Sequence, residues 1–528
     1  MQAKYITYQQ TNAFSSVVLD YIDEKDKLES FYKYSPTLQG FEKAIGERTF
    51  SGNRELLVKT LQQQYGQLNP SALVTQNITS LADDRTFTIT TGHQLNIFTG
   101  PLYFIYKIVS AIKLAADLKT QFPDYKFVPV YWMATEDHDF EEINHVKVED
   151  KMITWQTKAA GATGRINTST LTEALSAYKG YLGIGENGAA FSALVEKAYS
   201  GNKSLANATR ELANALFGQH GLVCVDADEP AFKAQFADII YRDITEQNSF
   251  KSISASNKAL EDQGYKTQVN PREINFFYMD DQLRERIVEE NGEYKVLNTS
   301  ISFSAETLKA EIDSHPERFS PNVVMRPVYQ EVILPNLAYI GGGAETTYWL
   351  QLKANFDFYQ VFYPILILRN SALVIDERSA RKMQILDISS ISLFNTDEQL
   401  KNQWIRAHVG DSLSLDDEQR AIRAVFDQIK LNAYKIDKGL SISAEAAKVK
   451  TLKLVTNLEK KLLRAEKRKH TTSLAQIDNL KNKLFPSGVL QERVLNIAPM
   501  YVLYGEDFIN SLVTAFKPLD HKFTVLYA

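Results

Sequence analysis

Residues 86–145 constrain the fold more than any other stretch, because they have the pattern of one strand–helix–strand unit. Residues 86–90 are a β-branched run that predicts a strand, and a polar turn with a single glycine follows at residues 91–94. Apolar residues then recur every three or four positions over residues 105–118, which predicts an amphipathic helix. The nearly continuous apolar run at residues 126–134 predicts a second strand, buried on both faces. Such a unit is typical of α/β proteins with a parallel sheet.

Polar residues stand at the carboxyl ends of both predicted strands. His93 follows the first strand, and residues 135–139, which include His138, follow the second. Ligands of open α/β sheets bind beyond the carboxyl ends of the strands. A solvated loop is the ordinary alternative for either segment alone, but two neighbouring loops that both carry a histidine favour a functional site.

Composition limits the classes of protein to consider. With 528 residues the chain is long enough for at least two structural units. Its net charge of -5 is spread over interspersed acids and bases, so we expect no nucleic-acid partner. No stretch reaches the ~18 apolar residues that span a bilayer, so we expect no membrane partner. The single cysteine, Cys224, lies in an apolar run; it excludes an internal disulfide and predicts a buried filler in a cytoplasmic protein.

Shifts in composition indicate how the first part of the chain is organised. Residues 1–384 are predicted to form an α/β catalytic core that begins with a helical lead-in at residues 1–85. One insertion is expected at about residues 147–200, which are rich in Gly, Ala, Ser and Thr. A second is expected at about residues 272–300, where alternating residues and turn signals predict an antiparallel meander.

Residues 385–486 are predicted to form a separate helical coiled coil. Apolar residues step by threes and fours over residues 452–484, after a shorter helix at residues 418–434 and a break near Lys438-Gly439. A hairpin within one chain and a seam between two copies both fit this pattern. Because the shorter helix covers only part of the apolar stripe, we expect a homodimer through this domain. Residues 487–528 then return to the core.

Residues 136–145 carry the densest chemistry, with five acids and two histidines. One interpretation is a metal-dependent hydrolase, whose metal needs three nitrogen or oxygen ligands. No HExxH motif and no paired-cysteine spacing supports it, so we expect no metal. The other interpretation is a pocket that binds a nucleotide or activates a carboxylate, with acids that hold an amine or Mg²⁺. The guanidinium groups of Arg272, Arg326 and Arg369 fit that pocket, because they bind carboxylate and phosphate.

Gly341-Gly342-Gly343 follow an apolar run and precede a segment compatible with a helix. Backbone amides at a helix start bind anions, so this segment is a candidate phosphate site. A plain tight turn is the alternative, since the spacing matches neither the dinucleotide fingerprint nor the Walker loop. A further class of function also stays open, that of a non-enzymatic coiled-coil scaffold with a regulatory nucleotide-binding core.

Several motifs stand along nearly the whole chain: Thr91-Gly92-His93-Gln94, Phe98-Thr99-Gly100-Pro101, Ala134-Thr135-Glu136-Asp137-His138-Asp139, Arg326-Pro327-Val328-Tyr329-Gln330-Glu331, Ala338-Tyr339-Ile340-Gly341-Gly342-Gly343, Tyr348-Trp349 and Leu490-Gln491-Glu492-Arg493. In this combination the chain resembles the bacillithiol biosynthesis cysteine-adding enzyme family. The pieces at residues 91–101 and 134–139 are together the most specific.

The resemblance implies a Rossmann-like core similar to that of class I aminoacyl-tRNA synthetases and nucleotidyltransferases, with a dimerising coiled coil. It implies a cysteine ligase that adds cysteine to glucosaminyl malate in the last step of bacillithiol biosynthesis. Amide formation from a carboxylate and an amine is uphill at neutral pH. We therefore expect activation by ATP or another adenine nucleotide, with Mg²⁺ as a candidate companion and no structural metal.

Four residues are the predicted catalytic group: His93, Glu136, Asp137 and His138. His93, together with Asn96, is predicted to contact the nucleotide or the developing charge. Glu136, Asp137 and His138 are predicted to orient the substrate amine and to move its proton.

Arg326 is predicted to bind a carboxylate of the substrate, that of malate. The remaining predicted substrate or nucleotide contacts come from the motifs above: Gly92, Gln94, Asn96, Thr99, Gly100, Lys107, Asn144, His145, Gln330, Gly342, Gly343, Glu345, Tyr348 and Arg369.

Overall fold

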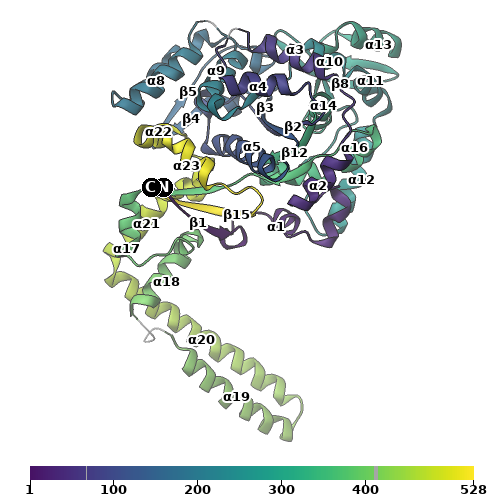
Figure 1. Cartoon of the computed structure of the whole chain (residues 1–528). Coiled ribbons are helices and arrows are strands. Elements are labelled where there is room, and N and C mark those ends of the chain that lie inside the picture. Colours follow the sequence, from purple (N-terminus) through teal and green to yellow (C-terminus); the bar gives the residue numbers. More distant parts are fainter. Residues whose placement is uncertain (67, 202, 410–413) are drawn as a thin grey trace.

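A helical hairpin projects from an α/β body in the computed structural model, which describes residues 1–66, 68–201, 203–409 and 414–528 (Figure 1). The hairpin is made of α19 (Asp416–Ile436) and α20 (Leu440–Lys469). The body contains the central sheet and both chain termini, which lie next to each other.

The body is built on a five-stranded parallel sheet in the order β13-β12-β2-β3-β6. Its strands are β2 (Thr86–His93), β3 (Lys126–Met133), β6 (Val223–Asp226), β12 (Asn336–Gly341) and β13 (Ile365–Leu368). The first of these strands in the chain, β2, lies in the middle, with the next two on one side and the last two on the other. The strand order therefore reverses between β2 and β12, which is where open α/β sheets bind their ligands.

The predicted strand–helix–strand unit is confirmed. β2 pairs in parallel with β3, and α5 (Leu102–Gln121) connects them as a largely buried helix. The predicted turn at residues 91–94 is wrong in part, because β2 continues through Gly92 and His93. Both residues keep their register against β3, opposite Trp132 and Met133, so the pairing extends the strand beyond the turn-like composition.

Each face of β2 has its own kind of side chain. Phe87 and Ile89 lie in an apolar cluster with α5 and with α2 (Leu38–Glu47). Thr88 and Thr90 alternate with them, and both hydroxyls donate to the side-chain oxygen of Asn336 on β12, at 3.0 and 2.8 Å. The buried threonine hydroxyls therefore have partners, which lets a polar face stay inside the protein.

The N-terminal segment is not wholly helical as expected. Helices α1 (Ser16–Ile22), α2, α3 (Arg54–Gln64) and α4 (Ala72–Ser80) are present, but the chain begins with strand β1 (Gln2–Thr7). β1 pairs antiparallel with the last strand, β15 (Lys522–Tyr527), which also pairs in parallel with β14 (Ala372–Ile375). A partner at the far end of the chain therefore decides the structure of the first residues.

Two segments depart from the strand–helix alternation. The first contains the hairpin β4 (His145–Val148) and β5 (Lys151–Thr154), then α7 (Thr172–Leu182) and α8 (Glu186–Tyr199). α9 (Leu205–Phe217) leads from it back to β6.

The second segment is an antiparallel sheet in the order β10-β9-β8-β7-β11, as the alternating pattern predicts. Its strands are β7 (Phe276–Asp280), β8 (Leu283–Glu290), β9 (Glu293–Val296), β10 (Ser302–Phe303) and β11 (Phe319–Pro321).

The predicted antiparallel hairpin is present in α19 and α20. Lys430 pairs with Glu445 at 2.8 Å and Lys448 with Asp427 at 3.0 Å, across the two helices. The predicted apolar stripe divides after Lys469, because α21 (Thr471–Leu484) buries its apolar residues in the body. Among the described residues, no helix combines the length and the apolar character needed to cross a membrane.

Candidate active site

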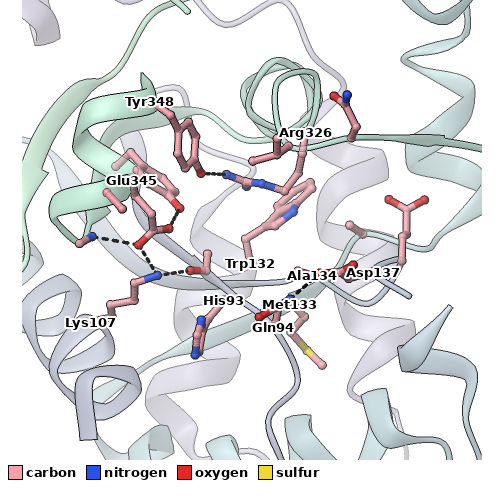
Figure 2. A pocket seen from close by; sticks show the side chains of 18 of the residues that line it. His93, Gln94, Lys107, Trp132, Met133, Ala134, Asp137, Arg326, Glu345 and Tyr348 are labelled. Atoms are coloured by element: carbon pink, nitrogen blue, oxygen red, sulfur yellow. Dashed lines mark hydrogen bonds and ion pairs between the residues drawn. The ribbon is translucent and has the colours of Figure 1, made fainter. Parts of the chain in front are cut away.

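A cavity of about 770 Å³ opens at the carboxyl ends of β2, β3 and β12, where the strand order reverses (Figure 2). Residues of the β7–β11 sheet and of the C-terminal segment also contribute to its wall. The lining residues are Gly92, His93, Gln94, Tyr103, Lys107, Trp132, Met133, Ala134, Glu136, Asp137, His138, Ala227, Phe277, Arg284, Pro321, Asn322, Val323, Arg326, Tyr339, Gly342, Gly343, Ala344, Glu345, Tyr348, Arg369 and Arg493. The volume is in the range of small-molecule sites.

Gly92 brings the end of β2 close to two polar groups of the cavity. A Cβ atom at this position would lie 3.1 Å from the Tyr339 hydroxyl and 3.3 Å from Nη1 of Arg326. Both distances are tighter than ordinary contacts, so any side chain here pushes against those groups. The glycine is required by close approach, since its backbone lies in a regular strand.

Lys107 and Glu345 form a buried ion pair on one side of the cavity (Figure 2). Lys107, on α5, also donates to the Gly92 carbonyl at 2.8 Å. Glu345, on α15 (Gly343–Leu350), accepts from the Gly342 amide at 2.9 Å and from the Tyr339 hydroxyl at 2.7 Å. Burial alone would raise the pKa of Glu345, but Lys107 and the two hydrogen bonds hold it below its ordinary value. The pair therefore stays charged and ties α5 to the start of α15.

Arg326 faces the cavity with neutral partners only. It begins α14 (Arg326–Ile333), donates to the side-chain oxygen of Gln330 at 3.0 Å and to the Tyr348 hydroxyl at 3.3 Å, and lies over the Tyr339 ring. Within the described residues, no carboxylate lies at ion-pair distance from its guanidinium. A partly buried guanidinium without a counter-charge attracts a carboxylate or a phosphate.

His93 presents a buried nitrogen that lacks a partner. Its ring lies 5.2 Å from the Tyr103 ring and 5.4 Å from the Phe104 ring, and Nε2 has no hydrogen-bond partner in the described chain. Burial, helped by the charges of Lys107 and Arg369, lowers the pKa of His93 well below its ordinary value. The imidazole is therefore neutral at pH 7.

Asp137 is an ionised carboxylate at the opposite side of the cavity. Its Oδ2 accepts from Gln94 at 2.6 Å, and its Oδ1 accepts from the His138 backbone amide at 2.8 Å. Burial alone would raise the pKa of Asp137, but His138, Gln94 and the charge of Arg284 hold it well below its ordinary value. A fixed negative charge of this kind is suited to bind an ammonium group.

Glu136 is committed to a lysine that the sequence did not single out. It forms an ion pair with Lys233 on α10 (Pro230–Ala234), whose side chain is fully buried and also donates to the Phe319 carbonyl at 2.7 Å. Burial raises the pKa of Glu136, although Lys233 opposes that shift. Lys233 stands alone in an ordinary helical segment, so no local signal marks it.

Arg369 lines the cavity, but its guanidinium group is held by Glu492 of the C-terminal segment. It donates to Glu492 at 2.7 Å and to the Ser371 hydroxyl at 3.0 Å. The other carboxylate oxygen of Glu492 accepts from the Ala372 amide at 3.0 Å. This fully buried link places the neighbouring Arg493 in the cavity wall, a residue whose only sequence signal is its motif.

Two family models match the chain. "Bacillithiol biosynthesis BshC, N-terminal Rossmann-like domain" covers residues 1–370, and "Bacillithiol biosynthesis BshC, C-terminal coiled-coil domain" covers residues 372–528. The chain belongs to the bacillithiol biosynthesis BshC family. The resemblance, the Rossmann-like core and the coiled coil are thereby confirmed.

Curated relatives align over the full length of this BshC-family chain. One from Flavobacterium psychrophilum is 45% identical over 100% of this chain and 99% of its own. One from Flavobacterium johnsoniae is 43% identical over 100% of both chains, and one from Christiangramia forsetii is 41% identical over 100% and 99%. Each carries the name "Putative cysteine ligase BshC".

A solved structure of a "putative arginyl t-RNA synthetase" from Campylobacter jejuni aligns with 87% of this chain and 98% of its own. Its identity is 13% and its TM-score 0.21, a level of similarity that carries no argument about fold or function.

Several predicted site residues of the BshC-family chain lie outside the cavity wall. Asn144 and His145 are at the start of the β4–β5 hairpin, where His145 is exposed and its Nδ1 lies 3.0 Å from the Asn144 side chain. The helical turn at Phe140–Ile143 separates them from Asp137. Gln330 is buried behind Arg326 and acts on the cavity only through that residue.

Asn96, Thr99 and Gly100 also lie outside the cavity and belong to a structural turn. Thr99 and Gly100 have positive φ angles of 73° and 62°. Asn496, from the C-terminal segment, donates to the Gly100 carbonyl at 2.6 Å and to the Phe98 carbonyl at 2.8 Å. This part of the motif therefore fixes the start of α5.

The acids and histidines of residues 136–145 are dispersed. Glu136 faces Lys233, Asp137 faces Gln94, and His145 is exposed. In the part of the chain that the structure describes, no group of three or more His, Cys, Asp or Glu side chains is placed to hold a metal ion.

Proposed function

We propose that this protein is a cysteine ligase that forms an amide bond between the carboxylate of cysteine and the amine of glucosaminyl malate, the last step of bacillithiol biosynthesis. Membership of the BshC family and the shared name of its relatives support this reaction. The observation that carries it is that one cavity contains two separate charged groups. They are the Arg326 guanidinium, which has no ion-pair partner among the described residues, and the ionised Asp137 carboxylate. Such a cavity recognises a substrate with both a carboxylate and an ammonium group.

The substrate roles follow from these two charges. Arg326 binds a carboxylate of the malate moiety, with Tyr348 fixing one edge of the guanidinium. Asp137 binds the substrate amine and is held for that task by Gln94. Gly92 leaves room for this arrangement, because a side chain there would contact Arg326.

We propose that an adenine nucleotide binds in the same cavity. The cavity lies at the reversal of strand order, and the first-turn residues Gly343 and Ala344 of α15 line it. ATP would supply the leaving group that makes the cysteine carboxylate reactive. His93 lines the cavity, and we expect its neutral ring to contact the bound nucleotide. Any Mg²⁺ would be held mainly by phosphate and water, since the described residues offer no group of three ligands.

The structure does not support the two alternative functions, the metal-dependent hydrolase and the non-enzymatic scaffold. A metal hydrolase needs its ligands together, whereas Glu136 is paired with Lys233 and the described residues contain no group of three or more His, Cys, Asp or Glu placed to hold a metal ion. A scaffold has no use for a polar cavity of this volume at the strand ends.

A purified incubation with cysteine, ATP and glucosaminyl malate tests the reaction, with mass detection of the amide product. We expect product only when all three are present. Arg326→Ala should raise KM for glucosaminyl malate by about 10- to 100-fold, the effect of losing a charged hydrogen-bonded contact. Arg381→Ala is the matched control, because Arg381 is exposed on α17 (Glu377–Ile385) and does not line the cavity. Absence of product from the folded wild-type protein would refute the assignment.

We also propose that two copies pair through the α19–α20 hairpin, whose apolar residues are exposed in the single chain. A cytoplasmic location agrees with the only cysteine, Cys224, which is buried and whose thiol pKa burial raises to about 12.

A further inference from the structure

Arg284 reaches the cavity from β8, in the antiparallel sheet outside the Rossmann-like strands. Its guanidinium lies 3.9 Å from the centre of the Phe277 ring. Its Nε donates to the Ser320 hydroxyl at 3.1 Å, and its Nη2 donates to the Pro321 carbonyl at 3.4 Å. Three contacts on two strands therefore fix its position and leave Nη1 to point at His138.

The contact between Arg284 and His138 settles where the histidine proton lies. Nη1 is 2.6 Å from Nδ1 of His138. A guanidinium can only donate hydrogen bonds, so Nδ1 must accept and carry a lone pair. The ring proton is then on Nε2. An imidazolium, or the other tautomer, would place two N–H groups against each other.

One aromatic ring and two charged groups surround His138. The ring lies 5.5 Å from the Phe277 ring, and Nδ1 is 3.7 Å from Oδ1 of Asp137. Asp137 and Arg284 are the charged groups that face it, while Glu136 is paired with Lys233. His138 is half-exposed to the cavity, and in the described chain its Nε2 meets no hydrogen-bond partner.

We propose that Arg284 is a positioning residue that holds His138 as a fixed Nε2–H donor towards an oxygen of the substrate or nucleotide. His138 then stabilises developing negative charge and does not take a proton from the amine, in contrast to the role expected from the sequence. The proposal rests on the ligase function for its substrate oxygen. The tautomer itself can be observed without any turnover.

If His138 acts as an Nε2–H donor, its variants should differ in activity. His138→Gln keeps an N–H near the position of Nε2, so we expect activity within about tenfold of wild type. His138→Asn, which presents its amide near Nδ1, and His138→Ala should both lose activity by about a hundredfold, the effect of removing one preorganised donor. A His138→Gln variant as inactive as His138→Ala would overturn the proposal.

If Arg284 positions His138, the effect of replacing Arg284 should depend on the presence of His138. Arg284→Ala frees the ring to exchange tautomers, so we expect it to lower activity, and Arg284→Lys, which can still donate to Nδ1, should restore part of the loss. In the His138→Gln background, Arg284→Ala should have little further effect. Arg286→Ala is the matched control, since Arg286 lies on the same strand, two residues away, and does not line the cavity. An equal loss of activity from Arg284→Ala in the wild-type and His138→Gln backgrounds would contradict the positioning role.

NMR of the protein labelled with ¹⁵N-histidine tests the tautomer directly. The signal absent from His138→Gln belongs to His138, and we expect it to show a protonated Nε2 and an unprotonated Nδ1 in the wild type. A proton on Nδ1 would overturn the inference even if the enzyme is a ligase. The expected tautomer in a protein that forms no amide would instead sink the ligase function alone.

Discussion

The cavity wall and the α19–α20 hairpin both contain many ion pairs, but the pairs differ in burial. Lys233 and Glu136 are 0% and 9% exposed, and Arg369 and Glu492 are 6% and 0% exposed. On the hairpin, Lys430 and Glu445 are 45% and 38% exposed. Removing one member of a buried ion pair leaves an uncompensated buried charge and strongly lowers the stability of the protein. An exposed pair is screened by water and contributes little to stability. The body therefore depends on a few pairs that cannot be replaced singly, and the hairpin does not.

The two regions also differ in where their apolar residues lie. In the body they form the core, whereas neither α19 nor α20 contains a buried residue. Leu454 is 69% exposed and Leu458 52% exposed on α20. A helix gains most of its stability from packing an apolar face. The hairpin is consequently the part of the chain with a surface left to pair.

Glu492→Ala should have the largest effect on stability. It leaves Arg369 buried without its counter-charge, so we expect the free energy of unfolding to fall by about 3–5 kcal/mol. Urea denaturation followed by tryptophan fluorescence measures this, because Trp132, Trp155 and Trp349 are buried in the body. Glu445→Ala on the hairpin is the control and should leave the midpoint unchanged. Equal shifts of the denaturation midpoint in the two variants would contradict the difference expected between buried and exposed ion pairs.

Glu331→Gln should make the body less sensitive to pH. Burial raises the pKa of Glu331 from 4.5 to about 7, against the opposing charge of Arg48. The folded state therefore binds this proton more tightly than the unfolded state, and its contribution to stability is lost as pH rises from about 4.5 to 7. The loss amounts to roughly 3 kcal/mol. The glutamine variant should lack this component and be more stable than wild type at pH 8, but not at pH 4.

In urea titrations across this pH range, the curves of wild type and Glu331→Gln should cross. Parallel curves would mean that Glu331 is ionised in the folded protein at neutral pH.

Leu454→Glu with Leu458→Glu should have the smallest effect on the folded body and a selective effect on assembly. Charges on the exposed face of α20 prevent pairing of two hairpins, while the body keeps its core. Light scattering at micromolar concentration should give a dimer for the wild type and a folded monomer for the variant. A wild-type protein that is monomeric under these conditions would return the hairpin to a purely intramolecular role.

Local periodicity was enough to predict one strand–helix–strand unit of the cavity. β2, α5 and β3 follow from residue spacing, and His93 and Asp137 follow from their place at the carboxyl ends of buried strands. Proximity in sequence misled in one place, because Asn144 ends the helical turn after Asp137 and His145 begins β4. A short motif does not show where the chain bends away.

Charges from distant segments could not be predicted. Lys233, Arg284 and Glu492 come from α10, β8 and the C-terminal segment, and only Glu492 belongs to a recognisable sequence motif. Their burial and their partners exist only in the folded protein. The same holds for β1, whose strand structure depends on pairing with β15.

The position of β15 between β1 and β14 has a consequence for how the protein is made. β1 precedes β15 by about 500 residues in the chain, so the β1 edge has no partner until the β15 segment has been synthesised. The C-terminal segment also contains Glu492, which pairs with Arg369, and Arg493, which lines the cavity. A chain interrupted before Glu492 therefore lacks part of the cavity wall, even when all five strands of the parallel sheet are present.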